Sequence, residues 1–248
     1  MDFYSQKIQK AQQVETSVEP FFVPKPPTTS RFIDIHTHEQ RLNKDVLEVQ
    51  NIIVGKDKLI NKQLFYSAGI HPWYVTDATL EQQLGEVRSL ALLDNVHFVG
   101  EIGLDKATQT RWELQKKAFV EQLKIAKAVQ KPVIIHSVRT IYEILAEKKN
   151  QKFDLPFVLH GFQHKEEVLK DVLKSACFCS FGARILQEKS TARLALASIP
   201  MDRFLLETDG ADISIQYIYF AAAAVRRVSV EELKEQMEQN FQKIINTK

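Results

Sequence analysis

The segment Arg31-Phe-Ile-Asp-Ile-His-Thr-His38 decides the fold, because a short apolar run ends there in side chains that can bind metal ions. The same arrangement recurs at Val99-Gly-Glu101, Ile134-Ile-His136, Val158-Leu-His160 and Leu205-Leu-Glu-Thr-Asp209. Short apolar runs of this kind predict strands of a parallel sheet that are buried on both faces. In a TIM barrel, functional side chains stand at the C-terminal ends of successive strands. We therefore predict an α/β protein with a (β/α)8 TIM barrel whose strand ends bring these groups together.

The length of the chain and the spacing of its apolar runs fit one barrel domain. The chain has 248 residues, and an eight-stranded α/β barrel takes about 250. Amphipathic helices are predicted at 113–129 and 165–174, and the capping box Ser229-Val-Glu-Glu232 predicts the start of a last helix. An open sheet is the alternative to a closed barrel. Predicted strands span 31–35, 50–54, 64–70, 96–100, 132–136, 156–160, 176–181 and 203–207.

Two stretches depart from the regular alternation of strand and helix. Residues 39–63 leave little room for a full helix on each side of the second strand, so a barrel trimmed around that strand is an alternative to a complete one. Residues 1–30 form an extension and linker before the barrel domain, which spans 31–248. A short amphipathic helix is predicted near the N-terminus, followed by the turn-forming stretch Pro24-Lys-Pro-Pro-Thr-Thr-Ser30.

Charge and hydropathy restrict the class of protein only weakly. The formal net charge of +2 neither requires nor excludes a nucleic-acid partner, because a local cleft can carry the binding charge. The N-terminus shows no apolar signal core, and the longest apolar stretch, Tyr217 to Val225, is too short to cross a membrane. We therefore expect a cytoplasmic protein that makes no membrane contact.

Histidines and carboxylates at the strand ends predict a metal centre. His36 and His38 are two residues apart on an extended segment, so both side chains can face one ion. A pair of packing or surface histidines is the alternative if they are taken alone, but His136 and His160 stand at equivalent strand ends. Imidazole together with carboxylate suits Mg, Mn or Zn. The predicted ligands are His36, His38, Glu101, His136, His160 and Asp209.

Two carboxylates in this set have chemistry beyond metal binding. Glu101 can bridge two ions with its two oxygens, and a structural ion pair is the alternative. Asp209 can bind an ion and also accept a proton from a metal-activated water, with a helix N-cap as the alternative. Glu101 and Asp209 are therefore the predicted catalytic residues. Glu207 is a candidate for a further ligand or base, and Asp34 for orienting a ligand imidazole.

Taken in order, these motifs resemble the TatD family of metal-dependent hydrolases, the TatD-type deoxyribonucleases of the amidohydrolase-like barrels. The likeness runs from about Arg31 to the C-terminus. The segments that carry it are Asp34-Ile-His-Thr-His38, Gly69-Ile-His-Pro72, Val99-Gly-Glu-Ile-Gly-Leu-Asp105, the helix with Gln115, Phe119 and Gln122-Leu123, Lys131-Pro-Val-Ile-Ile-His-Ser137 and Phe204-Leu-Leu-Glu-Thr-Asp209.

The resemblance implies a barrel with two or three divalent ions and hydrolysis of DNA phosphodiesters, often as an exonuclease. By position, His36, His38 and Asp209 would hold one ion. His136 and His160 would hold another, with Glu101 between the two ions. Hydrolysis of DNA phosphodiesters is therefore the activity that the resemblance leads us to expect.

The chain departs from the family's pattern where substrate is gripped. Lys106-Ala107 stands where the family usually has an aromatic residue, Gln163-His164 replaces a Thr-Gly pair, and Gly210-Ala211 follows Asp209 in place of a proline and an aromatic residue. We therefore expect Lys106 and Arg139 to contact the phosphate backbone of DNA, at its ends or in single strands. His71 would position substrate, and Trp73 would stack on a terminal base.

Two alternatives to DNA hydrolysis stay open. One is a metal-dependent hydrolase of a small lactone, amide or cyclic phosphate. The other is a TatD-like subunit of a larger assembly, with a protein partner docked through the N-terminal extension. A complete set of metal ligands would speak against the subunit of an assembly. A deep closed pocket would favour the hydrolase of a small substrate.

Overall fold

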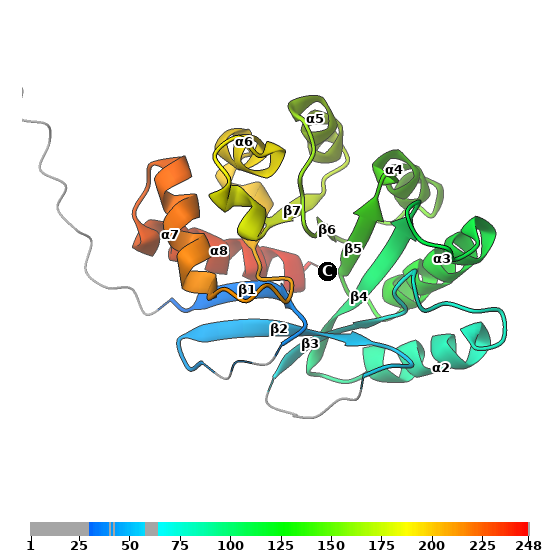
Figure 1. The fold of residues 1–248 in the computed structure, drawn as a ribbon. Coiled ribbons are helices and arrows are strands. Elements are labelled where there is room, and N and C mark those ends of the chain that lie inside the picture. Colours follow the sequence, from blue (N-terminus) through cyan, green and yellow to red (C-terminus); the bar gives the residue numbers. More distant parts are fainter. Residues whose placement is uncertain (1–29, 40, 42, 58–63, 248) are drawn as a thin grey trace, which may run out of the picture.

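Eight parallel strands form a single sheet that curves into a barrel (Figure 1). The computed structural model describes residues 30–39, 41, 43–57 and 64–247. Each strand pairs with the next along the chain, in the order β1 to β8. This confirms the predicted (β/α)8 TIM barrel and rules out the open-sheet alternative. The strands are β1 (Phe32–Thr37), β2 (Val46–Ile53), β3 (Phe65–Gly69), β4 (Val96–Asp105), β5 (Val133–Val138), β6 (Phe157–Leu159), β7 (Phe178–Phe181) and β8 (Phe204–Leu206).

Helices alternate with the strands from β3 onward and surround the barrel (Figure 1). The amphipathic segments 113–129 and 165–174 are confirmed as α3 and α5, and Ser229 caps α8 with the predicted capping box. None of the described helices is both long and apolar enough to cross a membrane. The helices are α2 (Leu80–Ala91), α3 (Trp112–Ala128), α4 (Ile141–Asn150), α5 (Glu166–Lys174), α6 (Thr191–Ser198), α7 (Ile215–Arg226) and α8 (Val230–Ile245), with the short 3₁₀ helices η1 (Ala183–Leu186) and η2 (Met201–Arg203).

The described part of the chain around β2 departs from the regular alternation of strand and helix. Among the described residues between β1 and β3, none is helical, which agrees with the trimmed alternative for that part of the chain. Only short connections therefore follow β1 and β2 on this side of the site. The helix expected near the N-terminus lies outside the described residues.

Side chains complete the barrel between its first and last strands. The Asp34 carboxylate accepts hydrogen bonds from the backbone N–H and the hydroxyl of Thr208, at 3.0 and 2.6 Å. One residue later, the N–H of Asp209 donates to the carbonyl of His36 at 3.0 Å. These bonds join the end of β8 to β1 and bring Asp209 beside His36.

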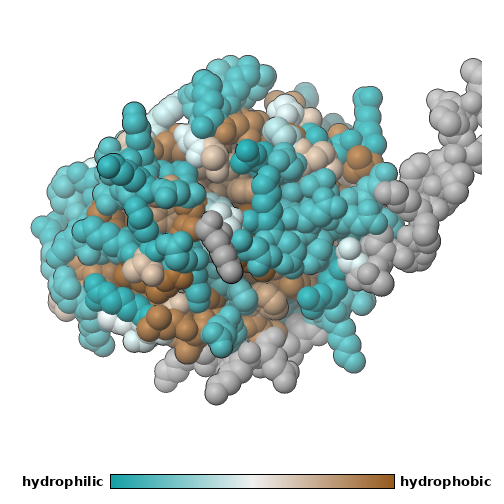
Figure 2. Space-filling model, turned by 180° about the vertical axis from the view of Figure 1, so that it is seen from behind, coloured by the Kyte–Doolittle hydropathy of each residue, from teal (hydrophilic) through white to brown (hydrophobic). Residues whose placement is uncertain are grey.

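Helix α8 covers the end of the barrel at which the strands begin. Phe241 packs against Phe65 of β3 and Phe98 of β4, with ring centroids 6.1 and 6.2 Å apart. The Asn240 amide donates to the carbonyls of Met201 and Phe204, both at 2.8 Å. From behind, the surface is a mixture of hydrophilic and hydrophobic residues (Figure 2). The C-terminal ends of the strands lie at the opposite end of the barrel, where the candidate site is found.

Two buried glutamines of α3 fix the backbone beside the site. Gln122 accepts from the N–H of Ile70 at 2.6 Å and donates to its carbonyl at 3.2 Å, in the manner of a neighbouring strand. Gln115 does the same for Asp105, at 2.8 and 3.1 Å. Because unpaired buried backbone groups are costly, these amides stabilise the ends of β3 and β4 where the sheet ladder stops.

The close approach of β4 to β5 requires a glycine, which gives a test of the fold. A Cβ on Gly103, whose φ is +151°, would overlap the carbonyl oxygen of His136. We expect Gly103→Ala to lower the free energy of unfolding by about 3 kcal/mol or more. Gly85, in the middle of α2, has open space around it. The control Gly85→Ala should raise stability by about 0.5–1 kcal/mol. Urea unfolding of both variants checks this, and equal stabilities would contradict it.

Candidate metal centre and active site

The predicted ligands come from five different strands and meet at the mouth of the barrel. Glu101 lies within β4, which continues to Asp105, and not at the end of a strand as predicted. The predicted ligands surround a cleft of about 300 Å³. His36 lies behind the cleft wall and is completely buried, whereas the side chain of Asp209 is 44% exposed. The cleft is lined by His38, Ile53, Lys56, His71, Trp73, Tyr74, Glu101, His136, His160 and Asp209.

The carboxylate of Glu101 divides the cluster into two sets. Its Oε2 lies 3.3 Å from Nε2 of His36 and 3.6 Å from Nε2 of His38. Its Oε1 lies 2.7 Å from Nδ1 of His136 and 2.7 Å from Nε2 of His160. Asp209 Oδ1 joins the first set, 3.5 Å from His36 and 3.6 Å from His38. The structure thus brings together the residues that the family resemblance assigns to each ion, and His160 also forms a possible donor group with His36 and Glu101.

His71 lies closer to the ligand cluster than a substrate contact needs to be. Its Nε2 is 3.3 Å from Glu101 Oε1 and 3.3 Å from Nδ1 of His136. His71, Glu101 and His136 each place a donor atom within 4.8 Å of the others, and all three are buried. The geometry therefore makes His71 a candidate third imidazole of the second set, in addition to its predicted contact with substrate.

The chemistry of the donor atoms fits divalent cations. Neither ring nitrogen of the completely buried His36 makes a hydrogen bond to the described residues, and buried polar atoms of this kind normally have a partner. Burial lowers the pKa of His36, but the carboxylates of Asp209 and Glu101 outweigh burial and raise that pKa to about 9. The pocket thus favours positive charge, and its mixed nitrogen and oxygen donors suit zinc or manganese.

Imidazoles hold the central carboxylate in its charged form. Burial raises the pKa of Glu101, but His160, His136 and His36 outweigh this effect and keep that pKa well below its usual range. Five imidazoles approach the Glu101 oxygens within 3.6 Å. A carboxylate that favours its charged form and turns each oxygen toward a different set of imidazoles is suited to bridging two cations.

Asp105 orients His136 and was assigned no role from the sequence. Its Oδ2 lies 3.1 Å from His136 Nε2 and accepts a hydrogen bond from the Trp73 indole at 2.6 Å. A carboxylate on the outer nitrogen fixes the ring so that its other nitrogen faces the ion. The sequence contained a signal, because Glu101, Gly103 and Asp105 alternate along β4 and side chains two apart share a face.

The two carboxylates predicted to support the ligands have different partners. Glu207, completely buried, accepts from the N–H of Gly161 at 2.7 Å and from the Ser180 hydroxyl, and its Oε1 lies 3.7 Å from Nδ1 of His160. It is thus placed behind His160, where it can orient that ring. The hydrogen bonds to the Asp34 carboxylate come from Thr208, so Asp34 positions the loop that carries Asp209.

The predicted substrate contacts do not gather in one place. Trp73 lines the cleft and is 52% exposed. Lys106 lies outside the cleft lining, where its ammonium pairs with Glu143 and sits 5.4 Å above the Trp112 ring. Arg139 lines a neighbouring pocket of about 190 Å³ that shares His160 with the cleft.

Three lining residues, Ile53, Lys56 and Tyr74, were not predicted from the sequence, and Lys56 and Tyr74 are the polar ones. The two polar residues come from separate loops, after β2 and after β3, and no strand-end motif marks them. The cation in the cleft lining is thus Lys56, from the side of β2, and neither of the two predicted cations, Lys106 and Arg139.

Removing the bridging carboxylate tests the two-set arrangement. We expect the protein saturated with manganese or zinc to hold two ions per chain by elemental analysis, and to melt at a higher temperature than metal-free protein. Glu101→Gln should lose both ions and most of this rise, because an amide cannot bridge two cations. Asp202→Asn, an exposed acid paired with Lys243, is the matched control and should bind as the parent does. One ion in the saturated parent would contradict the dinuclear arrangement.

Comparison with known proteins identifies the family of this chain. The family model described as TatD related DNase matches residues 6–246, and so begins within the N-terminal extension. An uncharacterized metal-dependent hydrolase of Haemophilus influenzae is 29% identical over 216 residues, 74% of this chain and 82% of the relative. The crystal structure of YjjV, a TatD homolog from Escherichia coli, superposes with a TM-score of 0.74 at 24% identity, covering 88% of this chain and 99% of that one. The chain belongs to the TatD family of metal-dependent hydrolases.

Proposed function

We propose that this chain hydrolyses phosphodiester bonds of DNA, working from strand ends as an exonuclease. The observation that carries the proposal is the position of Glu101, whose two oxygens face two separate sets of metal-type ligands. Two divalent ions bound there would activate water and stabilise charge on both the attacking and the leaving oxygen of a phosphodiester. That chemistry suits a phosphate ester, because one oxygen attacks the phosphorus atom while another leaves it.

Asp209 is the residue we assign as general base. Its side chain is 44% exposed, whereas Glu101 and Glu207 are buried, so among these three carboxylates Asp209 is the most accessible to solvent. The hydrogen bond from its N–H to His36 holds the residue at a left-handed φ of 49°. A carboxylate fixed at the edge of the ligand set can accept the proton of the attacking water and release it to solvent.

The size of the cleft favours the end of a strand over the middle of a duplex. A volume of about 300 Å³ is at the lower limit for sites that enclose small molecules, roughly 300–1,000 Å³. It can admit one nucleotide but not a double helix. The exposed face of Trp73 offers a stacking surface for a terminal base, an interaction worth roughly 1–3 kcal/mol. The same volume would also accept a small ester, which is why the substrate is the point to test.

DNA cleavage by an Asp209 variant tests the assignment of the base. With magnesium, manganese or zinc, the parent should shorten end-labelled single- and double-stranded DNA and spare a closed circular single strand. Asp209→Asn should lower kcat by at least about a thousandfold, roughly 4 kcal/mol, because an amide does not accept the proton. It should stay folded by circular dichroism.

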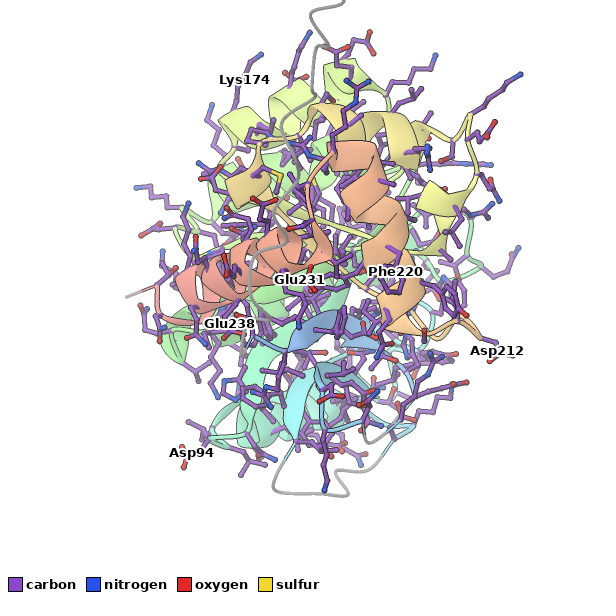
Figure 3. The ribbon with its side chains drawn as sticks, turned by 90° about the vertical axis from the view of Figure 1, so that its left-hand side faces the viewer. Asp94, Lys174, Asp212, Phe220, Glu231 and Glu238 are labelled. Atoms are coloured by element: carbon purple, nitrogen blue, oxygen red, sulfur yellow. The ribbon has the colours of Figure 1, made fainter. Side chains whose placement is uncertain are left out.

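The matched control is Asp212→Asn, an exposed acid three residues further along the same loop (Figure 3). It should cleave DNA at the parental rate. An Asp209→Asn variant that keeps more than about a tenth of the rate, a loss below about 1.4 kcal/mol, would show that Asp209 is not the base. Turnover of lactones or cyclic phosphates without cleavage of any DNA would transfer the assignment to a small-substrate hydrolase.

A further inference from the structure

Lys56 brings a positive charge to the cleft. The residue follows Gly55, whose φ is +86°, in a turn after β2. The N–H groups of Lys56 and Asp57 both donate to the carbonyl of Ile53, at 3.0 and 2.9 Å, and the Asp57 carboxylate accepts from the N–H of Ile53 at 2.9 Å. A turn closed by three hydrogen bonds gives the base of the Lys56 side chain a defined position at the rim.

Lys56 has a tyrosine as its partner, and not a carboxylate. Its ammonium lies 3.5 Å from the Tyr74 hydroxyl and 5.1 Å above the Tyr74 ring. No ion pair between described residues involves it, because the neighbouring Asp57 carboxylate is turned back onto Ile53. By contrast, lysines paired with a carboxylate include Lys106, Lys116, Lys117, Lys124, Lys170, Lys174 and Lys243. The Lys56 charge is therefore available to an anion in the cleft.

A buried amide holds the two loops of this rim together. Gln83 of α2 donates to the carbonyl of Val54 at 3.3 Å and to the carbonyl of Tyr74 at 3.2 Å. The chain passes close to that amide at Gly55, where a Cβ would lie 2.9 Å from Gln83 Nε2. Gln83 thus links the loop of Lys56 to the loop of Tyr74, and both side chains face the cleft that Glu101 and Asp209 line.

We propose that Lys56, with Tyr74 beside it and Trp73 next along the wall, forms a subsite for a second phosphate adjacent to the scissile one. The inference rests on the phosphodiesterase function proposed above and names its substrate class. An ammonium binds phosphate as a point charge, and an aromatic wall contacts sugar or base. The preferred substrate is then a strand end that carries a further phosphate one nucleotide from the bond to be cleaved. A diester with a single phosphate has no second phosphate to contact Lys56.

Small substrates that differ by one phosphate test the subsite. The probes are a thymidine dinucleotide without a terminal phosphate, the same dinucleotide phosphorylated at its 5′ or its 3′ end, and bis(p-nitrophenyl) phosphate. One of the two phosphorylated forms should have a KM about fivefold lower than the bare dinucleotide. Lys56→Met should abolish that advantage. The KM values of the bare dinucleotide and of the nitrophenyl diester should change much less than the KM of the phosphorylated form.

Two further variants separate a specific contact from general charge. Tyr74→Phe removes the hydroxyl beside the ammonium but keeps the ring, and should reduce the advantage without abolishing it. Lys174→Met removes the same charge from α5, where Lys174 pairs with Asp171. Lys174 is labelled at the upper left of Figure 3. This variant should leave every KM at the parental value.

The outcomes distinguish this proposal from the one it rests on. If the dinucleotides are cleaved but Lys56→Met changes all KM values equally, or none, the subsite is wrong and the phosphodiesterase stands. If neither diester is cleaved in any metal, the proposed function is wrong. Calorimetric titration of the phosphorylated and bare dinucleotides into the metal-loaded parent and Lys56→Met then decides the subsite by binding alone. Equal affinities in the parent would overturn it.

Discussion

One ionised carboxylate among five imidazoles organises the molecule. Glu101 is almost completely buried, and a charge at such a depth persists only where opposite or strongly polarisable groups surround it. Each of its oxygens faces a different set of donor atoms. The ends of β1, β4, β5 and β6 must therefore converge to within a few ångströms of one side chain. Much of the fold near the site can be understood as what makes that convergence possible.

The supporting interactions act on backbone and ring orientation more than on charge. Gly103 lets β4 approach β5, and the α3 glutamines pair with strand ends that the sheet ladder no longer reaches. Behind the imidazoles, Asp105 fixes His136 and Glu207 lies beside His160. Exposure rises from Glu101 through His38 to Asp209, so the cluster passes from a buried centre to an open edge within one cleft. A base belongs at that edge, because a proton must leave there to water.

The sequence predicted what periodicity and strand ends determine, and it missed what depends on contacts between loops. The eight strands follow from short apolar runs, and the six ligand candidates follow from donor side chains at the ends of five of those runs. Asp105 was within reach of the same reasoning, since it shares the face of Glu101 on β4. Lys56 was not, because its place in the cleft depends on Gln83 of α2 and on Tyr74 from another loop. Lys106 lies outside the cleft lining for the matching reason, since it pairs with Glu143 of α4.

The trimmed side of the barrel explains why the cleft is chemically asymmetric. Where no described helix follows a strand, the connection stays short and its residues stand at the rim itself, as Lys56 does after β2. On the opposite side, the loops after β5 and β6 form the separate pocket that contains Arg139. Reaction chemistry then depends on strand ends fixed by the sheet, while selectivity depends on loops that can vary without disturbing it. The departures from the family pattern all fall in such loops. A chain can therefore keep the hydrolytic centre of its family and still bind the substrate through residues of its own.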